Sequence, residues 1–166
     1  CWDKVVPLLE SQGHDVIAVD LPGNTYGEFD VPPSQVTLSS YADYVCKVLD
    51  ELDEPVVLVG HSLGGLTITQ AAELRPDKIR SLVYLTALLF RDGTAMMPVA
   101  ARDSDSIRAG LQRDSWTVSE DLATVVFHEE SLKRRFYNDC SDGDIEWAKP
   151  MLVPQPTGPL IDQAQT

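Results

Sequence analysis

The sequence is poor in cysteine and histidine, and this shortage excludes several kinds of site. It has 3 cysteines and 3 histidines in 166 residues, with no spacing typical of a zinc site or a disulfide framework. The odd cysteine count predicts free thiols, as expected in a reducing compartment. We therefore expect a cytoplasmic protein without a metal centre, although a signal peptide upstream of Cys1 stays open.

Basic side chains and long apolar runs are also scarce. The sequence has 13 lysines and arginines but 26 acidic residues, which gives a net charge of −13. Nucleic acids and anionic lipid surfaces are bound by clustered basic residues. The longest apolar run, 82–90, is about half of the roughly 18–20 residues that span a bilayer. The sequence predicts neither a nucleic-acid nor a membrane partner and leaves the oligomeric state open.

The two ends of the sequence do not look like natural termini. It opens on Cys1 instead of Met, inside an apolar, helix-like pattern. It stops at Thr166, directly after a stretch rich in proline and glutamine. We therefore expect a piece of a longer protein.

Helical and strand-like patterns alternate through the first half of the chain. Apolar residues three and four apart predict helices, and short unbroken apolar runs predict strands that are buried on both faces. The predicted helices cover 2–9, 38–52 and 63–74, and the predicted strands cover 16–19, 56–59 and 82–85. This alternation predicts an α/β fold, with a parallel sheet and flanking helices.

The pattern changes after residue 90, where strand-like runs largely disappear. Short helices are predicted at 119–127, at 131–136 and from Ser141 to about Pro150. We interpret 91–160 as a mostly helical lid inserted above the sheet. The core of the fold then occupies 1–90, and 161–166 begins a further, truncated part of that core.

A Gly-x-Ser-x-Gly motif lies at 60–64, between a predicted strand and a predicted helix. This context predicts a tight turn with an unusual backbone conformation at Ser62, which projects its hydroxyl above the strand end. Gly60 and Gly64 lack side chains, so the two arms of the turn can approach closely. The N–H of Leu63, at the helix start, can stabilise an oxyanion at the same place.

The stretch Val-Leu-Val-Gly-His-Ser-Leu-Gly-Gly at 57–65 resembles the nucleophile elbow of the α/β-hydrolases. Residues 2–9 and 13–23 are similar to the first helix and the following strand of that family. The sequence segments 136–140 and 154–156 resemble the lid of the methylesterase and hydroxynitrile-lyase-like branch. The resemblance therefore covers nearly the whole chain.

The resemblance implies an α/β-hydrolase that acts on a small carboxylic ester without a cofactor. Ser62 would be the nucleophile that forms an acyl-enzyme, and Leu63 N–H would hold the oxyanion. The remaining elbow residues are Gly60, His61, Gly64 and Gly65. Two alternatives stay open: a hydroxynitrile lyase on the same fold, and a ligand-binding relative without catalysis.

The resemblance also implies catalytic groups that this chain does not contain. The family order is serine, acid, histidine, and both partners follow the lid. His14 and His61 have contexts typical of packed or hydrogen-bonded histidines, and His128 lies in the lid. Asp92 is the best internal acid, yet its place after a strand is typical of a solvated loop. We expect the base, the acid and a second oxyanion donor outside this chain, and no activity from this chain alone.

Two further expectations concern the lid and the sheet. Apolar lid residues either line an ester pocket or simply pack together: Met96, Met97, Trp116, Phe127, Phe136 and Trp147. The resemblance places a strand absent from this chain between 16–19 and 56–59. Since adjacent strands are about 4.8 Å apart, we expect these two roughly 10 Å apart with unpaired edges. The alternative is that the two strands pair directly.

Overall fold

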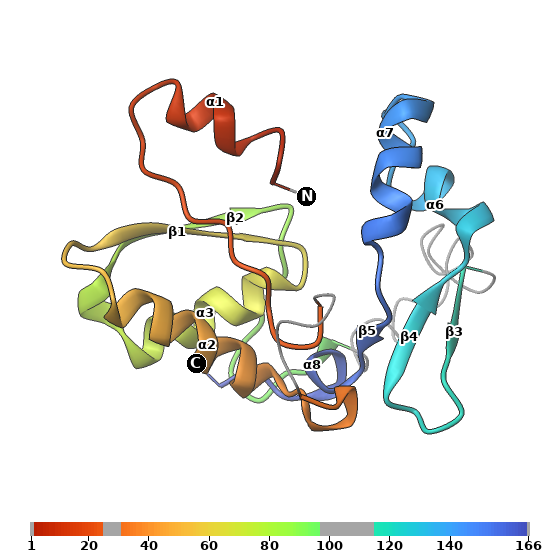
Figure 1. Cartoon of the computed structure of the whole chain (residues 1–166). Helices are drawn as coiled ribbons and strands as arrows, with labels where there is room; N and C mark the ends of the chain where they lie inside the picture. The colour runs from red at the N-terminus through yellow and green to blue at the C-terminus, as the bar shows by residue number, and fades with distance from the viewer. Residues whose placement is uncertain (1, 25–30, 97–114, 166) are drawn as a thin grey trace.

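The computed structural model describes residues 2–24, 31–96 and 115–165. Figure 1 shows a small parallel sheet with two helices on one side and α1 (Val6–Glu10) on the other. A second, antiparallel sheet with short helices lies beside this unit. Within the described ranges, no helix is both long and apolar enough to cross a bilayer.

The parallel sheet consists of β1 (Val56–His61) and β2 (Ile79–Leu85). The two strands pair in register up to His61 opposite Leu85, with one irregularity between Val56 and Val57. Both strands contain the apolar runs that predicted them, so the strands expected at 56–59 and 82–85 are confirmed. Their carboxyl ends lie at the same edge of the sheet.

One face of the sheet is covered by α2 (Leu38–Asp50) and α3 (Gly64–Leu74), which also pack on each other. Both helices were expected from the sequence. Helix α2 begins in a capping box, in which Thr37 and Ser40 exchange side-chain and backbone hydrogen bonds. The core between helices and sheet is built from Val45, Cys46, Leu49 and Ala71, with Leu21, Val56, Leu58 and Ile79 packed around them.

The opposite face of the sheet is exposed, contrary to the expectation of strands buried on both faces. Val57, Val59, Val83 and Leu85 keep 54%, 42%, 41% and 48% of their surface accessible. The side chains alternate because successive residues of a strand point to opposite faces. Helices α2 and α3 therefore bury only the side chains on one face of the sheet.

The strand expected at 16–19 is wrong for this chain. Residues 14–20 have no regular secondary structure, and Ile17 is 59% exposed. A strand is stabilised by its ladder hydrogen bonds, and no described strand pairs with this segment. Within the described residues this segment does not pair directly with β1, as expected if a strand position between them is vacant. The expected spacing of roughly 10 Å between 16–19 and 56–59 stays a prediction.

The region predicted as the lid contains a three-stranded antiparallel sheet in addition to helices. Its order is β3 (Trp116–Val118), β4 (Thr124–Phe127) and β5 (Gln155–Pro156). The helix expected at 119–127 is therefore wrong. The Asp121 carboxylate accepts hydrogen bonds from Ser119 Oγ and from Ala123 N–H, which closes a turn between β3 and β4. The Thr-Val-Val run that follows favours a strand.

The other helices of this region agree with the sequence. Helix α6 (Glu129–Arg135) and α7 (Asp142–Ala148) match the predictions at 131–136 and from Ser141. Ser141 Oγ accepts from Asp144 N–H and caps α7. Short helices at Pro33–Gln35, Pro76–Lys78, Lys149–Met151 and Gly158–Ile161 (α8) complete the described elements. The boundaries of the core and lid at 90 and 160 stay predictions.

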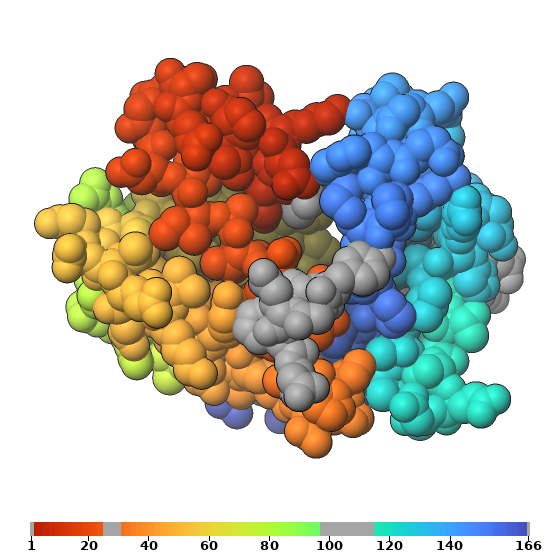
Figure 2. Space-filling view, viewed as in Figure 1, coloured from red at the N-terminus to blue at the C-terminus, as the bar shows by residue number. Residues whose placement is uncertain are grey.

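The lid region returns to the core beside the start of α2. Leu38 N–H donates to the Asp162 carboxylate at 2.8 Å, and Gln155 Nε2 donates to the Tyr41 hydroxyl at 3.2 Å. At Gly158 an added Cβ would lie 2.0 Å from the carbonyl oxygen of Val36, so only glycine fits. On another side Lys4 pairs with Asp144, where Figure 2 shows the N-terminal segment meeting the α7 region.

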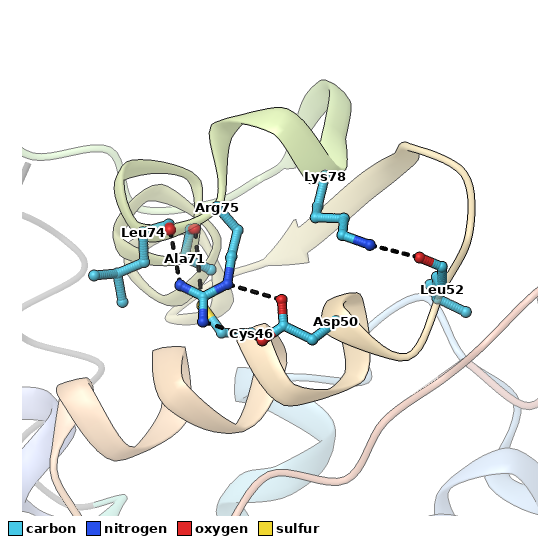
Figure 3. A network of polar contacts seen from close by, with 7 residues as sticks. All are labelled: Cys46, Asp50, Leu52, Ala71, Leu74, Arg75 and Lys78. Atoms are coloured by element: carbon cyan, nitrogen blue, oxygen red, sulfur yellow. Dashed lines mark hydrogen bonds and ion pairs between the residues drawn. The ribbon is translucent and has the colours of Figure 1, made fainter.

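The carboxyl ends of α2 and α3 are joined by a network of polar contacts (Figure 3). The Arg75 guanidinium donates to both carboxylate oxygens of Asp50, at 2.8 and 3.0 Å, and to the carbonyl of Leu74. Nearby, Lys78 Nζ donates to the carbonyl of Leu52 at 2.7 Å. Cys46 beneath this network is a free thiol, and burial raises its pKa.

Candidate active site

The Gly-x-Ser-x-Gly motif forms the expected tight turn between strand and helix. Strand β1 ends at His61 and α3 begins at Gly64, so only Ser62 and Leu63 make the connection. Ser62 has φ of 54°, in the left-handed region that non-glycine residues rarely adopt. Such a conformation costs of order 1–3 kcal/mol and persists only where the surroundings enforce it. The unusual backbone predicted at Ser62 is confirmed.

Two glycines allow this turn, Gly60 and Gly65, and only Gly60 was expected. At Gly60 an added Cβ would lie 2.6 Å from the carbonyl oxygen of Gly64, so the arms approach as predicted. At Gly64 an added Cβ meets nothing within 4 Å, which corrects its expected role. At Gly65 it would lie 2.2 Å from the carbonyl oxygen of Leu88. Helix α3 thus starts directly against the segment that follows β2.

The carbonyl of Ser62 anchors the turn on both sides. It accepts a hydrogen bond from Leu88 N–H at 2.9 Å and from Gly65 N–H at 3.1 Å. Thr86, which begins the segment after β2, is a second non-glycine residue in the left-handed region, with φ of 44°. The sequence contained no local signal for Leu88, because its contact with the elbow spans more than twenty residues.

The chemically reactive groups of the elbow are accessible. Ser62 and His61 are exposed, and Leu63 is half-buried. No described residue forms a hydrogen bond with the Ser62 hydroxyl or with Leu63 N–H. The N-terminus of α3 adds a partial positive charge near both groups. This arrangement can place a nucleophile and an oxyanion donor beside one carbonyl group, and both roles stay predictions.

Among the described residues, none of the three histidines forms a hydrogen bond with this turn. His14 is exposed just after the turn that follows α1, and His61 is exposed at the end of β1, although packed or hydrogen-bonded histidines were expected at both positions. His128 lies within the lid, where its Nε2 is 2.6 Å from the Thr117 hydroxyl. Among the described residues no histidine contacts the Ser62 hydroxyl, so the base stays predicted outside this chain.

Asp92 is also remote from the elbow. It lines an open hollow of about 270 Å³ at the carboxyl-terminal half of α3, with Gln70, Glu73, Leu74 and Gln165. Ser62 lies at the opposite end of the same helix. Asp92 therefore lies away from Ser62, and the loop role favoured for it stays a prediction.

Two of the apolar lid residues, Phe127 and Phe136, pack on each other. Phe127 and Phe136 meet edge to face with ring centroids 4.9 Å apart, and the Arg135 guanidinium lies 5.1 Å from both rings. Trp116 is opposite Phe127 in the β3–β4 register. Trp147 is 48% exposed, and Met97 lies outside the described residues. A role for these residues in a substrate pocket stays a prediction.

Residues 1–144 match the family model described as the alpha/beta hydrolase fold. This chain belongs to the α/β-hydrolase fold family. The strand, the strained serine and the following helix are therefore a strand–turn–helix segment of an α/β-hydrolase fold. The fold class predicted from the sequence is confirmed.

Named relatives place this α/β-hydrolase-fold chain in the methylesterase-like branch. It is 46% identical to methylesterase 1 of Arabidopsis thaliana over 126 residues, which cover 72% of this chain and 45% of that protein. Tomato methylketone synthase I has a TM-score of 0.81 at 25% identity, over 100% of this chain and 67% of that one. A pyrethroid hydrolase from Sphingobium faniae has a TM-score of 0.78 at 27% identity, over 100% of this chain and 66% of that one. The chain spans about half the length of the curated relatives it matches.

Proposed function

We propose that the protein carrying this chain hydrolyses a small carboxylic ester, with Ser62 as the nucleophile. The observation that carries the proposal is the left-handed Ser62 at the junction of β1 and α3, in a chain of the α/β-hydrolase fold. Two relatives, methylesterase 1 and the pyrethroid hydrolase, are named for ester hydrolysis. The ester's acid and alcohol parts stay open.

The proposed reaction proceeds in two halves. Ser62 Oγ attacks the ester carbonyl while its proton passes to a histidine base supplied from outside this chain. Leu63 N–H stabilises the oxyanion of the tetrahedral intermediate. The intermediate collapses, the alkoxide leaves with the proton from the base, and an acyl-enzyme remains on Ser62. Water, deprotonated by the same base, then releases the acid and regenerates the serine. No step calls for a cofactor.

Two earlier alternatives receive different support. Nothing in the geometry or among the relatives named above favours a hydroxynitrile lyase. A ligand-binding protein without turnover would keep the same fold, but would not need a strained and exposed serine at the strand end. Ester hydrolysis is therefore the better account. A cytoplasmic location stays a prediction.

The proposal is tested by comparing Ser62→Ala with wild type in the full-length protein. With a panel of methyl and aryl esters, we expect the substitution to lower kcat by about 10³-fold or more, since the nucleophile acts as a unit with its base. Ser81→Ala is the matched control, because Ser81 is exposed and its hydroxyl bonds only its neighbour's carbonyl. Thermal unfolding checks that both variants fold.

Three outcomes decide the matter. Loss of ester turnover in Ser62→Ala alone supports the proposal. Retention of most activity in that variant contradicts the role of Ser62. Release of cyanide from a cyanohydrin, without ester turnover, would contradict the ester hydrolase and establish the lyase.

A further inference from the structure

A line of hydrogen bonds connects β2 to the elbow through the first turns of α3. The Tyr84 hydroxyl lies 2.7 Å from Thr69 Oγ1, and Thr69 Oγ1 lies 2.7 Å from the carbonyl oxygen of Gly65. The same Gly65 donates its N–H to the carbonyl of Ser62. Tyr84 is therefore joined to the proposed nucleophile's own peptide by two side-chain bonds and one backbone bond.

The direction of these bonds follows from the number of protons. The Thr69 hydroxyl has one proton, and the Gly65 carbonyl can only accept, so Thr69 donates to Gly65. The Tyr84 hydroxyl must then donate to Thr69 Oγ1. Each group has the partner it needs, and a chain of hydrogen bonds oriented in one direction strengthens its members.

The strand register explains why Tyr84 can hold this helix. Tyr84 lies directly opposite Gly60, the residue whose missing side chain lets the start of α3 approach β1. Both residues face α3, because Tyr84 is half-buried on the covered face of the sheet. The tyrosine ring beside Gly60 reaches along α3 to Thr69, about one turn beyond Gly65.

We propose that Tyr84 and Thr69 are positioning residues for Ser62. They fix the first turns of α3 against β2, and thereby fix where the Ser62 hydroxyl and Leu63 N–H lie relative to each other. Neither side chain touches the reacting atoms in this account, which rests on the proposed ester hydrolase function. Their removal should misplace the nucleophile and the oxyanion donor in the transition state, while substrate binding is retained.

The test uses Tyr84→Phe and Thr69→Val in the full-length protein. Each removes one hydroxyl and keeps the shape of the side chain. We expect kcat to fall about 10-fold, the size of one net hydrogen bond, with KM within about twofold of wild type. Thr69→Ser retains the hydroxyl and should restore most of kcat. The double variant should lose no more than either single variant, since both break the same line of bonds.

A matched control separates this effect from loss of any tyrosine hydroxyl. Tyr137→Phe removes the hydroxyl of a half-buried lid tyrosine, and this hydroxyl has no hydrogen-bond partner among the described residues, so the substitution should leave kcat unchanged. Wild-type kcat in Tyr84→Phe and Thr69→Val, or additive losses in the double variant, would overturn the positioning role. Failure of the proposed function looks different: wild type would lack ester turnover, or Ser62→Ala would retain it.

Discussion

Ser62 holds a backbone conformation that serine disfavours, and its neighbours supply the compensation. Its carbonyl accepts two backbone hydrogen bonds, one from α3 and one from the segment after β2. Close packing at Gly60 and Gly65 leaves no room for the helix start to move away. At the residue scale, the strain at the proposed nucleophile is therefore maintained by contacts with two separate parts of the chain.

The two adjacent glycines of α3 offer a direct comparison at this scale. Gly65→Ala would push a Cβ to 2.2 Å from the carbonyl oxygen of Leu88. We expect it to lower the free energy of unfolding by about 1–3 kcal/mol. Gly64→Ala meets no atom within 4 Å and should raise that free energy by about 0.4–1 kcal/mol, because alanine reduces the freedom of the unfolded chain. Urea unfolding of both variants measures the difference.

Equal effects of the two substitutions would contradict this account of the elbow. The strain at Ser62 could be predicted from the sequence, because the motif and its flanking patterns are local. The need for glycine at position 65 could not be predicted, since it depends on how β2 brings Leu88 back to α3. Sequence patterns report local geometry well and distant contacts poorly.

At the scale of elements, an ion pair joins α2 and α3 at their carboxyl ends. Arg75 forms two hydrogen bonds to the Asp50 carboxylate, and both side chains are partly exposed, at 39% and 45%. The hydrogen bonds from Arg75 hold the pKa of Asp50 below its usual value. Solvent screens such a pair, so its contribution to stability is modest and depends on pH.

This pair predicts a pH-dependent effect of Asp50→Asn on stability. The folded protein lowers the pKa of Asp50, so the stabilisation is present above the ordinary value of about 3.9 and is lost as pH falls through the lowered pKa. We expect Asp50→Asn to lower Tm at pH 7, and we expect this difference from wild type to shrink as pH falls through the lowered pKa. Thermal unfolding between pH 2 and 7 measures this difference.

Asp43→Asn is the control for that experiment, since Asp43 is an exposed carboxylate on the same helix without an ion pair among the described residues. It should give no comparable loss of Tm at pH 7. A difference between Asp50→Asn and wild type that stays constant from pH 7 to pH 2 would mean that the pair does not act through the carboxylate charge.

The sequence predicted some elements well and others wrongly, for physical reasons. Helix α2 has a long periodic apolar stripe and its own capping box, so it can be predicted from its own sequence. The segment 119–127 instead forms a turn and strand β4, which are fixed by pairing with β3 and β5. The run at 16–19 looks like a buried strand, but no strand in the described part of the chain pairs with it.

At the scale of the whole molecule, one face of the parallel sheet is apolar and uncovered. Val57, Val59, Val83 and Leu85 are each more than 40% exposed, and among the described strands β1 and β2 pair only with each other. Exposed apolar faces and open strand edges favour association with other chains. The 166-residue chain produced by itself should therefore associate, and it should bind a dye that reports exposed apolar surface.

Light scattering of the purified chain tests this expectation. Val59→Lys should reduce both association and dye binding, because it places a charge in the middle of the exposed face. Ser81→Lys is the control, since Ser81 on the same face is already polar. A wild-type chain that stays monomeric and unfolds cooperatively, with measurable esterase activity, would contradict both the expected association and the expected lack of activity.

Covalent trapping at Ser62 tests the central claim most directly. The full-length protein is treated with a fluorophosphonate or a slowly hydrolysed aryl ester, and the adduct is mapped by mass spectrometry of its peptides. The account predicts one adduct per chain, on Ser62, and none in Ser62→Ala. An adduct on another serine, or continued labelling of Ser62→Ala at the wild-type rate, would contradict Ser62 as the nucleophile.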